Sequence, residues 1–273
     1  MNVYEIITNQ IISNLEKGII LWKKPFTSAS PKNYVTENNY KGINYFLLSS
    51  SNFLNPFFLT FKQIQDLGGS VKKGEKGFIV IFYKSLEIET DKEKNKTVPM
   101  LKYYYVWNWE QTTGIQEKTI DTKNNNPISE CEKIINDIKY KPVIKQGLKA
   151  CYIPSIDTIQ IPDLKYFDSE SSYYSVLFHE LTHWTGHEKR LNRDGIKTIA
   201  FGSECYSKEE LIAELGASFL CSFTGILQQT ITNSTAYIQN WLQVLKNDSR
   251  FIIQASSQAQ KAIDFILGVS KDE

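Results

Sequence analysis

The sequence predicts an α+β protein, with a small N-terminal α+β domain built on an antiparallel sheet and a mainly helical C-terminal domain. Two runs in the first half, FIVIFY at 78–83 and KYYYVWNW at 102–109, are rich in the β-branched and aromatic residues that favour paired strands. The last third instead has apolar residues at helical spacing. The helices expected there span 208–224, 236–247 and 251–267.

Length and composition fit two globular domains. The chain has 273 residues, of which 41% are hydrophobic and 13% are aromatic, so each half can bury a core. The polar run EKTIDTKNNNP indicates a linker, and we place the domains at 1–121 and 122–273. The net charge of the whole chain is +1, but the two halves differ. Residues 1–120 have a net charge of +4, from 15 Lys against 11 Asp and Glu, and the remaining residues have a net charge of −3. The first half is therefore the expected polyanion binder.

Hydropathy and cysteine spacing bear on the compartment. No run approaches the roughly 20 apolar residues that cross a bilayer, and the first ten residues, MNVYEIITNQ, lack the pattern of a signal peptide. We therefore expect a cytoplasmic protein without a membrane partner. The four cysteines form no C-x-x-C pair, which predicts reduced thiols rather than a zinc ribbon or a disulfide framework.

Glycines and capping residues outline further elements. Residues 3–17 carry an apolar stripe and are followed by Gly18, which predicts an amphipathic helix. The other expected elements are a capped helix at 59–64 that ends near Gly68-Gly69, a helix at 128–138, strands at 150–153 and 158–161, and a helix within 172–186.

The last of these helices contains HELTH at 179–183, an H-E-x-x-H pattern. On a helix this spacing places His179 and His183 one turn apart on the same face, where two imidazoles can bind a metal ion. Zinc is the expected ion, with another divalent metal as the alternative, and Glu180 is the expected catalytic base that takes a proton from water. Gly186 is expected to end the helix in the left-handed conformation.

A third ligand is expected from the later segment EELIAELG. Glu210 and Glu214 are four residues apart, so they share a helix face. Together with Ala213 they are similar to the E-x-x-A-[DN] segment of other H-E-x-x-H peptidases, in which the first acid binds zinc. Glu210 is therefore preferred, and Glu214 is its alternative or the group that orients a ligand histidine. His187 competes as a ligand, although Lys189 stands where a third histidine normally follows.

Aromatic and basic residues alternate in the segment that begins LWKKPF at Leu21. Aromatic rings offer flat faces to unpaired bases and lysines follow the phosphates, a combination typical of single-strand binders. The alternative is that these rings belong to the core of a small domain. The basic turn SVKKGEKG at 70–77 can bring its backbone close to a phosphate, and its alternative role is a hairpin tip with solvated lysines.

Several sequence motifs along both halves of the chain occur in the same order as in a known protein family. The N-terminal half contains YEIITNQIISNLEKGIILWKKPF, PKNYVTENNYKGINYFLL, FLTFKQIQDLGGSVKKGEKG and VWNWEQTTGI, and the C-terminal half contains ACYIPSIDTIQIPDLKYF, YYSVLFHELTHWTGHEKRLNR and YSKEELIAELGASFLCSFTGI. Over essentially its full length the chain resembles the ArdC-type antirestriction proteins of conjugative plasmids and phages. The first half is similar to their single-stranded-DNA-binding domain, and the second is similar to their zincin-like metallopeptidase domain. One departure is LWKKPF, where the family commonly has a P-W-x-x-P-W type segment.

The resemblance implies an antirestriction protein of a mobile element that protects incoming DNA from host restriction. It implies single-stranded DNA as a partner, together with an unidentified protein substrate for which a restriction enzyme is one candidate. The alternative is a non-catalytic DNA-coating protein with a structural or vestigial metal site. Tyr206 or His187 is a candidate donor to the oxyanion. The candidate DNA contacts are Trp22, Lys23, Lys24, Asn44, Lys62, Lys72, Lys73 and Lys76.

Overall fold

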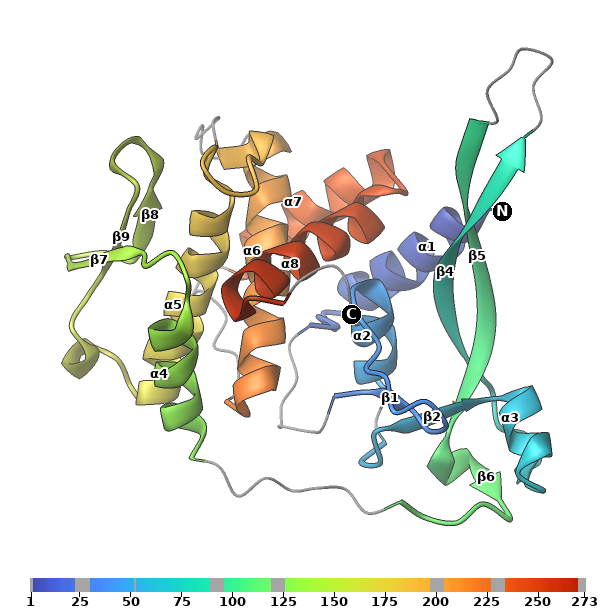
Figure 1. Cartoon of the computed structure of the whole chain (residues 1–273). Coiled ribbons are helices and arrows are strands. Elements are labelled where there is room, and N and C mark those ends of the chain that lie inside the picture. Colours follow the sequence, from blue (N-terminus) through green and yellow to red (C-terminus); the bar gives the residue numbers. More distant parts are fainter. Residues whose placement is uncertain are drawn as a thin grey trace. The chain divides into compact units, whose positions relative to one another are not determined.

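The computed structural model describes residues 2–22, 30–51, 53–88, 96–118, 126–196, 204–226 and 234–269, without the side chains of 85–88, 96–99, 204–206 and 234–238 (Figure 1). It divides into two compact units, one formed by Met1–Ile7 and Ala29–Ile120 and the other by Thr8–Ser28 and Asp121–Glu273. The domain boundary at 121/122 stays a prediction, and the units differ from it because residues 8–28 group with the second unit. Helices and strands in both halves confirm the α+β class.

The first unit contains a four-stranded sheet in the order β1-β2-β5-β4. Its antiparallel core confirms the predicted pairing, and β4 and β5 form a long two-stranded ribbon in Figure 1. The short edge strand β1 runs parallel to β2, and neither was predicted. The strands span Lys32–Asn33 (β1), Phe57–Thr60 (β2), Phe78–Ile88 (β4) and Lys96–Asn108 (β5).

Both faces of this sheet carry apolar side chains. On one face Phe58, Val80 and Val106 pack with Leu48 of α2 (Ile43–Ser49). On the other, Leu59 packs with Ile64 of α3. The helix predicted at 59–64 is present as α3 (Phe61–Asp66), but it begins two residues later because Leu59 and Thr60 belong to β2. The hydroxyl of Thr60 caps it by accepting a hydrogen bond from the backbone N–H of Gln63. The helix α1 (Val3–Glu16) is divided between the two units after Ile7. The remaining elements of the first unit are the paired strands β3 (Ser70–Val71) and β6 (Thr112–Thr113), and the 3-10 turn η1 (Trp109–Gln111).

The second unit combines a small sheet with helices. The sheet has the order β7-β9-β8, in which the two predicted strands, β8 and β9, pair antiparallel and β7 lies parallel to β9. The strand β7 was not predicted, because VIKQ is short and mostly exposed. The elements are α4 (Pro127–Asp137), β7 (Val143–Gln146), β8 (Cys151–Ile153), β9 (Thr158–Ile161), α5 (Glu170–Thr185), α6 (Glu204–Thr224), α7 (Ser234–Asn247) and α8 (Phe251–Leu267), with the 3-10 turns η2 (Pro154–Ile156), η3 (Leu164–Tyr166) and η4 (Asp194–Ile196).

The helices α5 and α6 lie unusually close together at Gly216. A Cβ on Gly216 would stand 2.5 Å from the side-chain Oγ1 and Cγ2 of Thr182, so only glycine allows this approach. Thr182 lies between His179 and His183, and Gly216 follows Glu214 by two residues, so the contact lies beside both pairs of predicted ligands. The sequence therefore sets the spacing of the two helices that carry them.

Gly186 corrects a prediction. It follows α5 with φ −76° and ψ −9°, a right-handed conformation rather than the left-handed one that we expected. Glycine is needed here for a steric reason instead. A Cβ at this position would lie 2.5 Å from Cγ1 of Ile196 and 2.8 Å from Nη2 of Arg193, which is too close. The glycine therefore makes room for the returning loop.

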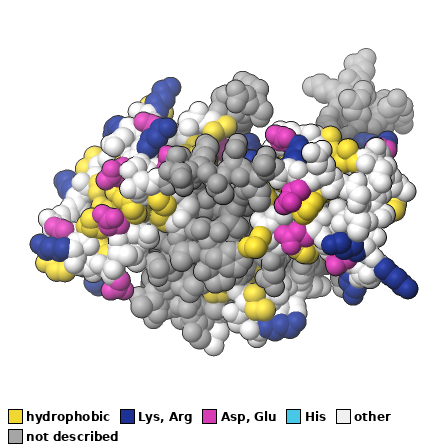
Figure 2. Space-filling view, turned by 90° about the horizontal axis from the view of Figure 1, so that it is seen from below, with side chains coloured by type: hydrophobic (Ala, Val, Ile, Leu, Met, Phe, Trp, Pro, Cys, Tyr) yellow, Lys and Arg dark blue, Asp and Glu magenta, His cyan; other side chains and the backbone are white. Residues whose placement is uncertain are grey.

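Three further findings concern the surface and the thiols. No helix in the described parts of the chain is long and apolar enough to span a membrane. Cys131, Cys151 and Cys221 are free, as predicted, and the side chain of Cys205 is not described. On the described surface in Figure 2, charged side chains of both signs are interspersed rather than gathered in one block.

Candidate metal centre

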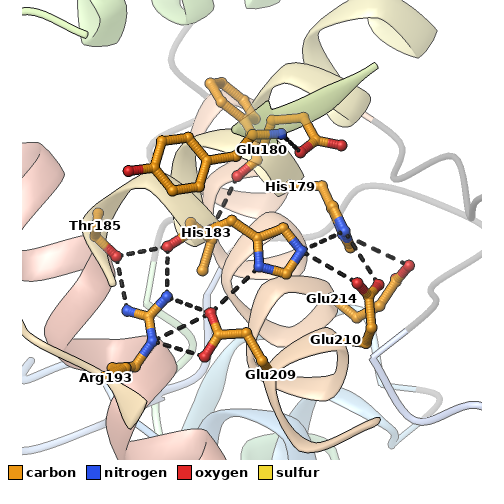
Figure 3. Close-up of polar contacts among 11 residues, drawn as sticks. His179, Glu180, His183, Thr185, Arg193, Glu209, Glu210 and Glu214 are labelled. Carbon is orange, nitrogen blue, oxygen red and sulfur yellow. Dashed lines mark hydrogen bonds and ion pairs between the residues drawn. The ribbon is translucent and has the colours of Figure 1, made fainter. Parts of the chain in front are cut away.

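Helix α5 brings the two motif histidines together. It begins at Ser169, whose hydroxyl accepts a hydrogen bond from the backbone N–H of Ser172. His179 and His183 are both buried, and their Nε2 atoms lie 3.1 Å apart. Figure 3 shows both rings turned toward Glu210 of α6. The i, i+4 spacing therefore gives the geometry that the motif predicts.

Glu210 completes a three-residue cluster. Its Oε2 lies 3.5 Å from Nε2 of His179, and its Oε1 lies 3.5 Å from Nε2 of His183. Donors bound tetrahedrally to one ion at 2.0–2.1 Å are separated by about 3.4 Å. The distances of 3.1, 3.5 and 3.5 Å fit that requirement. In the described part of the chain, these three residues are the group of His, Cys, Asp or Glu side chains that could hold a metal ion.

Glu214 occupies a different position. Its Oε1 lies 3.7 Å from Nδ1 of His179, the ring nitrogen that faces away from the cluster. The geometry therefore favours Glu210 as the ligand and Glu214 as the carboxylate that orients the ring of His179. The spacing of Glu210 and Glu214 could not tell which of them is the ligand. The structure distinguishes them, because Glu210 approaches Nε2 of His179 and Glu214 approaches Nδ1.

His183 is held by a buried ion pair that sequence reasoning missed. Its Nδ1 lies 3.2 Å from Oε1 of Glu209, and that carboxylate is bound by Nε and Nη2 of Arg193. Arg193 also donates to the carbonyl oxygen of Thr182 and to the hydroxyl of Thr185. The sequence did contain a signal for Glu209, because it directly precedes the expected ligand Glu210. Arg193 belongs to a loop and gave no signal.

Charge and burial act in opposite directions on the cluster. Burial lowers the pKa of His183, but its contacts with Glu209 and Glu210 outweigh this and raise the pKa to about 10. The pKa of His179 is also raised, because the contact with Glu210 outweighs burial. Burial alone raises the pKa of Glu210, yet the two imidazoles hold it well below its usual range. Without a metal these contacts pair protonated histidines with an ionised carboxylate, so a divalent cation that binds here would replace the histidine protons.

Glu180 lies beside the cluster on the side of strand β8. Its Oε2 accepts a hydrogen bond of 2.7 Å from the backbone N–H of Tyr152, and Figure 3 shows its carboxylate directed away from Glu209 and Glu210. Tyr152 is held in turn, because its hydroxyl donates to Asp157 and accepts from Arg190. Arg190 also stacks on Trp184 of α5, with Cζ 4.0 Å from the ring centroid. The strand is thus fixed to the helix that carries the motif.

A cleft of about 930 Å³ opens next to this strand. Tyr152 lines it and also touches Glu180, so the cleft adjoins the expected base. His187, the competing ligand, lies on the rim of the cleft, where its Nδ1 accepts from the backbone N–H of Lys189. The structure does not bring His187 to the cluster. The side chain of Tyr206 is not described.

The candidate DNA contacts are dispersed. Trp22 is 2% exposed and packs edge-on against Trp241, with ring centroids 5.4 Å apart. Asn44 makes two hydrogen bonds with the backbone of Ile81, through its amide nitrogen and its oxygen. Both side chains thus have structural contacts, and a DNA role for them stays a prediction. Lys23 and Lys24 lie outside the described residues.

The remaining candidate lysines are exposed in the first unit. Lys62, Lys73 and Lys76 lie at the surface, near α3 and the turn before β4. Lys72 is also exposed, and its Nζ donates to the carbonyl oxygen of Glu110. These positions are open to a polyanion, and their contact with DNA stays a prediction.

Comparisons with known proteins cover both halves of the chain. The N-terminal domain of anti-restriction factor ArdC matches residues 1–107, and a zincin-like metallopeptidase family matches residues 129–258. A DNA primase TraC of Escherichia coli is 31% identical over 99% of this chain, which spans only 27% of that primase's length.

Two crystal structures of the antirestriction ArdC protein from the R388 plasmid are similar over the whole chain. The metal-free structure is 33% identical, with a TM-score of 0.81 and 97% of both chains covered. The Mn(II)-bound structure is also 33% identical, with a TM-score of 0.80, and covers 100% of this chain and 99% of that one. Because the order of domains, the fold and the full length all agree, this chain belongs to the ArdC family of antirestriction proteins.

Proposed function

We propose that this protein protects the incoming DNA of a mobile element from restriction in the cytoplasm. Its N-terminal domain, placed at 1–121, binds single-stranded DNA, and its C-terminal domain, placed at 122–273, is a zinc-dependent peptidase that cleaves a protein acting on that DNA. The observation that carries the proposal is the buried cluster of His179, His183 and Glu210 with Glu180 beside it. Two imidazoles and one carboxylate are the ligand set of many zinc peptidases.

The three ligands would hold the zinc ion, and the surrounding residues fix their orientation. Glu209, clamped by Arg193, sets the ring of His183, and Glu214 stands behind the ring of His179. When bound, zinc supplies a Lewis acid that polarises a peptide carbonyl and lowers the pKa of water to about 7. Burial of all these side chains excludes bulk water, which strengthens each electrostatic contact.

Glu180 would act as the base in this proposal. A carboxylate oxygen takes the proton of the attacking water and then returns it to the leaving nitrogen. The backbone N–H of Tyr152 holds Oε2 of Glu180, which leaves Oε1 as the proton acceptor. The cleft along Tyr152 gives room for side chains of a bound peptide.

A non-catalytic DNA-coating protein is the second candidate function. The hydrogen bond between Glu180 and the amide of Tyr152 favours it, because the same contact would also suit a carboxylate that only fastens β8 to α5. In this alternative the metal site stabilises the fold, and protection of DNA needs no hydrolysis.

Glu180→Gln separates the two candidates. The substitution keeps the size of the side chain and removes the base, so we expect metal content to be unchanged and cleavage of a quenched-fluorescent peptide library to fall at least about 100-fold. Glu170→Gln, at an exposed position at the start of the same helix and outside the cleft lining, is the matched control and should keep full activity. Equal cleavage by wild type and Glu180→Gln would reject the peptidase assignment. Protection of single strands that survives in Glu180→Gln would favour the coating function.

A further inference from the structure

The first unit has a row of aromatic rings on one face of its sheet. Consecutive ring centroids are 5.9 Å apart from Tyr103 to Tyr105, 6.5 Å from Tyr105 to Trp107, and 5.9 Å from Trp107 to Phe61. Phe61 is 50% exposed, Tyr105 is 45% exposed and Tyr103 is 42% exposed. Trp107, which joins them, is partly buried because it also packs on the core cluster that contains Leu59 and Ile64. Half-exposed rings joined in this way are unusual on a protein surface and mark a binding surface.

The row follows from strand geometry. Tyr103, Tyr105 and Trp107 alternate along β5, so their side chains point to the same face at a spacing of about 6.8 Å, twice the rise per residue. Phe61, the first residue of α3, extends the row beyond the end of the strand.

Gly77 allows the ring of Trp107 to lie flat on the neighbouring strand. A Cβ at Gly77 would stand 2.9 Å from Cε2 and Cζ2 of Trp107 and 3.0 Å from Cβ of Tyr105. No larger residue fits at this position without moving the indole. The row is therefore part of the architecture of the ribbon.

The charge beside the row is positive. Between Phe61 and Gly77 the chain has four lysines, at 62, 72, 73 and 76, against Asp66 and Glu75, which gives a net +2. Lys62, Lys73 and Lys76 are exposed, and no ion pair of theirs is found among the described residues. A polyanion with flat bases fits both the rings and the net positive charge beside them.

We propose that Phe61, Trp107, Tyr105 and Tyr103 form a platform on which successive bases of single-stranded DNA stack, with Lys62, Lys73 and Lys76 beside the phosphates. The inference rests on the single-strand binding proposed above and assigns its site. Stacking on rings tolerates every base, because each base has a flat face. The platform therefore predicts binding without sequence preference, as protection of an arbitrary transferred strand requires.

The test measures fluorescence anisotropy of a labelled oligothymidylate with the full-length protein. Tyr103→Leu and Tyr105→Leu each remove a ring from an exposed position, and we expect each to raise Kd about fivefold or more. Tyr103→Phe and Tyr105→Phe keep the rings and should bind within about twofold of wild type. The matched control is Phe82→Leu, an exposed ring that packs on Tyr104 on the opposite face of the sheet, and it should not change Kd.

A second measurement uses the wild-type protein alone. An oligomer of the same length without bases keeps the phosphates and loses stacking, so its Kd should rise by at least the amount seen in the leucine variants. Suppose that wild type binds oligothymidylate. If the leucine variants then bind as tightly as wild type, or if wild type binds the two oligomers equally, the platform is overturned and single-strand binding stands. If wild type fails to bind, the proposed DNA binding fails first and the platform falls with it. Leucine variants that lose only self-association, seen by light scattering, would assign the row to a second copy of the chain and overturn the inference.

Discussion

The candidate metal centre and the aromatic row hold their side chains in opposite ways. His179, His183, Glu209 and Glu210 are buried, and each is fixed by another charged or ring side chain of the same chain. The rings of Phe61, Tyr103 and Tyr105 are about half exposed, and ring contacts through Trp107 join them. A buried polar network is costly to break because its partners lose their contacts. We therefore expect substitutions in the metal centre to change folding and metal binding together, and substitutions in the row to change binding alone.

The largest effect is expected from His183→Ala. The substitution removes one of the three proposed ligands and deprives Glu209 and Glu210 of their contacts with His183. We expect purified wild type to contain about one divalent ion per chain and the variant to contain almost none, measured by elemental analysis after dialysis. His187→Ala is the control, because His187 lies on the cleft rim, and it should retain the ion. Equal metal content in both variants would contradict the ligand assignment.

Arg193→Met tests the ion pair behind the ligands. The variant leaves the carboxylate of Glu209 buried with His183 as its remaining partner, and breaking a buried pair in this way costs about 3–5 kcal/mol of unfolding free energy. Urea unfolding would measure the loss, and metal affinity should fall about 10–100-fold because the ring of His183 loses its orientation. Arg250→Met, at an exposed position, should change the unfolding free energy by less than about 0.5 kcal/mol. A stable Arg193→Met protein with wild-type affinity would show that the pair is dispensable.

Gly216→Ala tests the close approach of α5 and α6. Alanine gains about 1 kcal/mol in helix propensity, but its Cβ would overlap Oγ1 and Cγ2 of Thr182 at 2.5 Å. We expect a net loss of about 1–3 kcal/mol in unfolding free energy and weaker metal binding, because α6 must shift away from the histidines. The double variant Gly216→Ala with Thr182→Ala removes the overlapping atoms and should recover part of the loss. Additive losses in the double variant would exclude the steric explanation.

The same contrast explains what the sequence could predict. His179 and His183 are four residues apart on one helix, and Glu210 and Glu214 are four apart on another, so local periodicity placed each pair before any tertiary information. The strands at 78–83 and 102–109 were predicted for the same reason, since alternation and composition are local signals.

Contacts between residues far apart in the chain could not be predicted from the sequence. Arg193 reaches Glu209 across 16 positions from a loop, and no periodic signal marks it. Gly186 was assigned a left-handed conformation because helix ends favour one, whereas the packing of Ile196 requires the glycine. Trp22 is a candidate DNA contact from the resemblance, and the structure buries it against Trp241, which no local signal indicated. Composition shows that a segment contains rings but does not show which of them stay at the surface.

The smallest effect on the fold is expected from the lysines beside the row. Replacing exposed Lys73 and Lys76 with Gln removes no ion pair found in the described part of the chain, so the unfolding free energy should change by less than about 0.5 kcal/mol. If both lysines neutralise phosphates, the slope of log K against log salt for single-stranded DNA should become shallower by about 0.7 for each. Leucine variants of the rings should instead keep the wild-type slope and bind more weakly at every salt concentration, because stacking releases no counterions. A ring variant that flattens the slope, or a lysine variant that leaves it unchanged, would break this division between rings and charges.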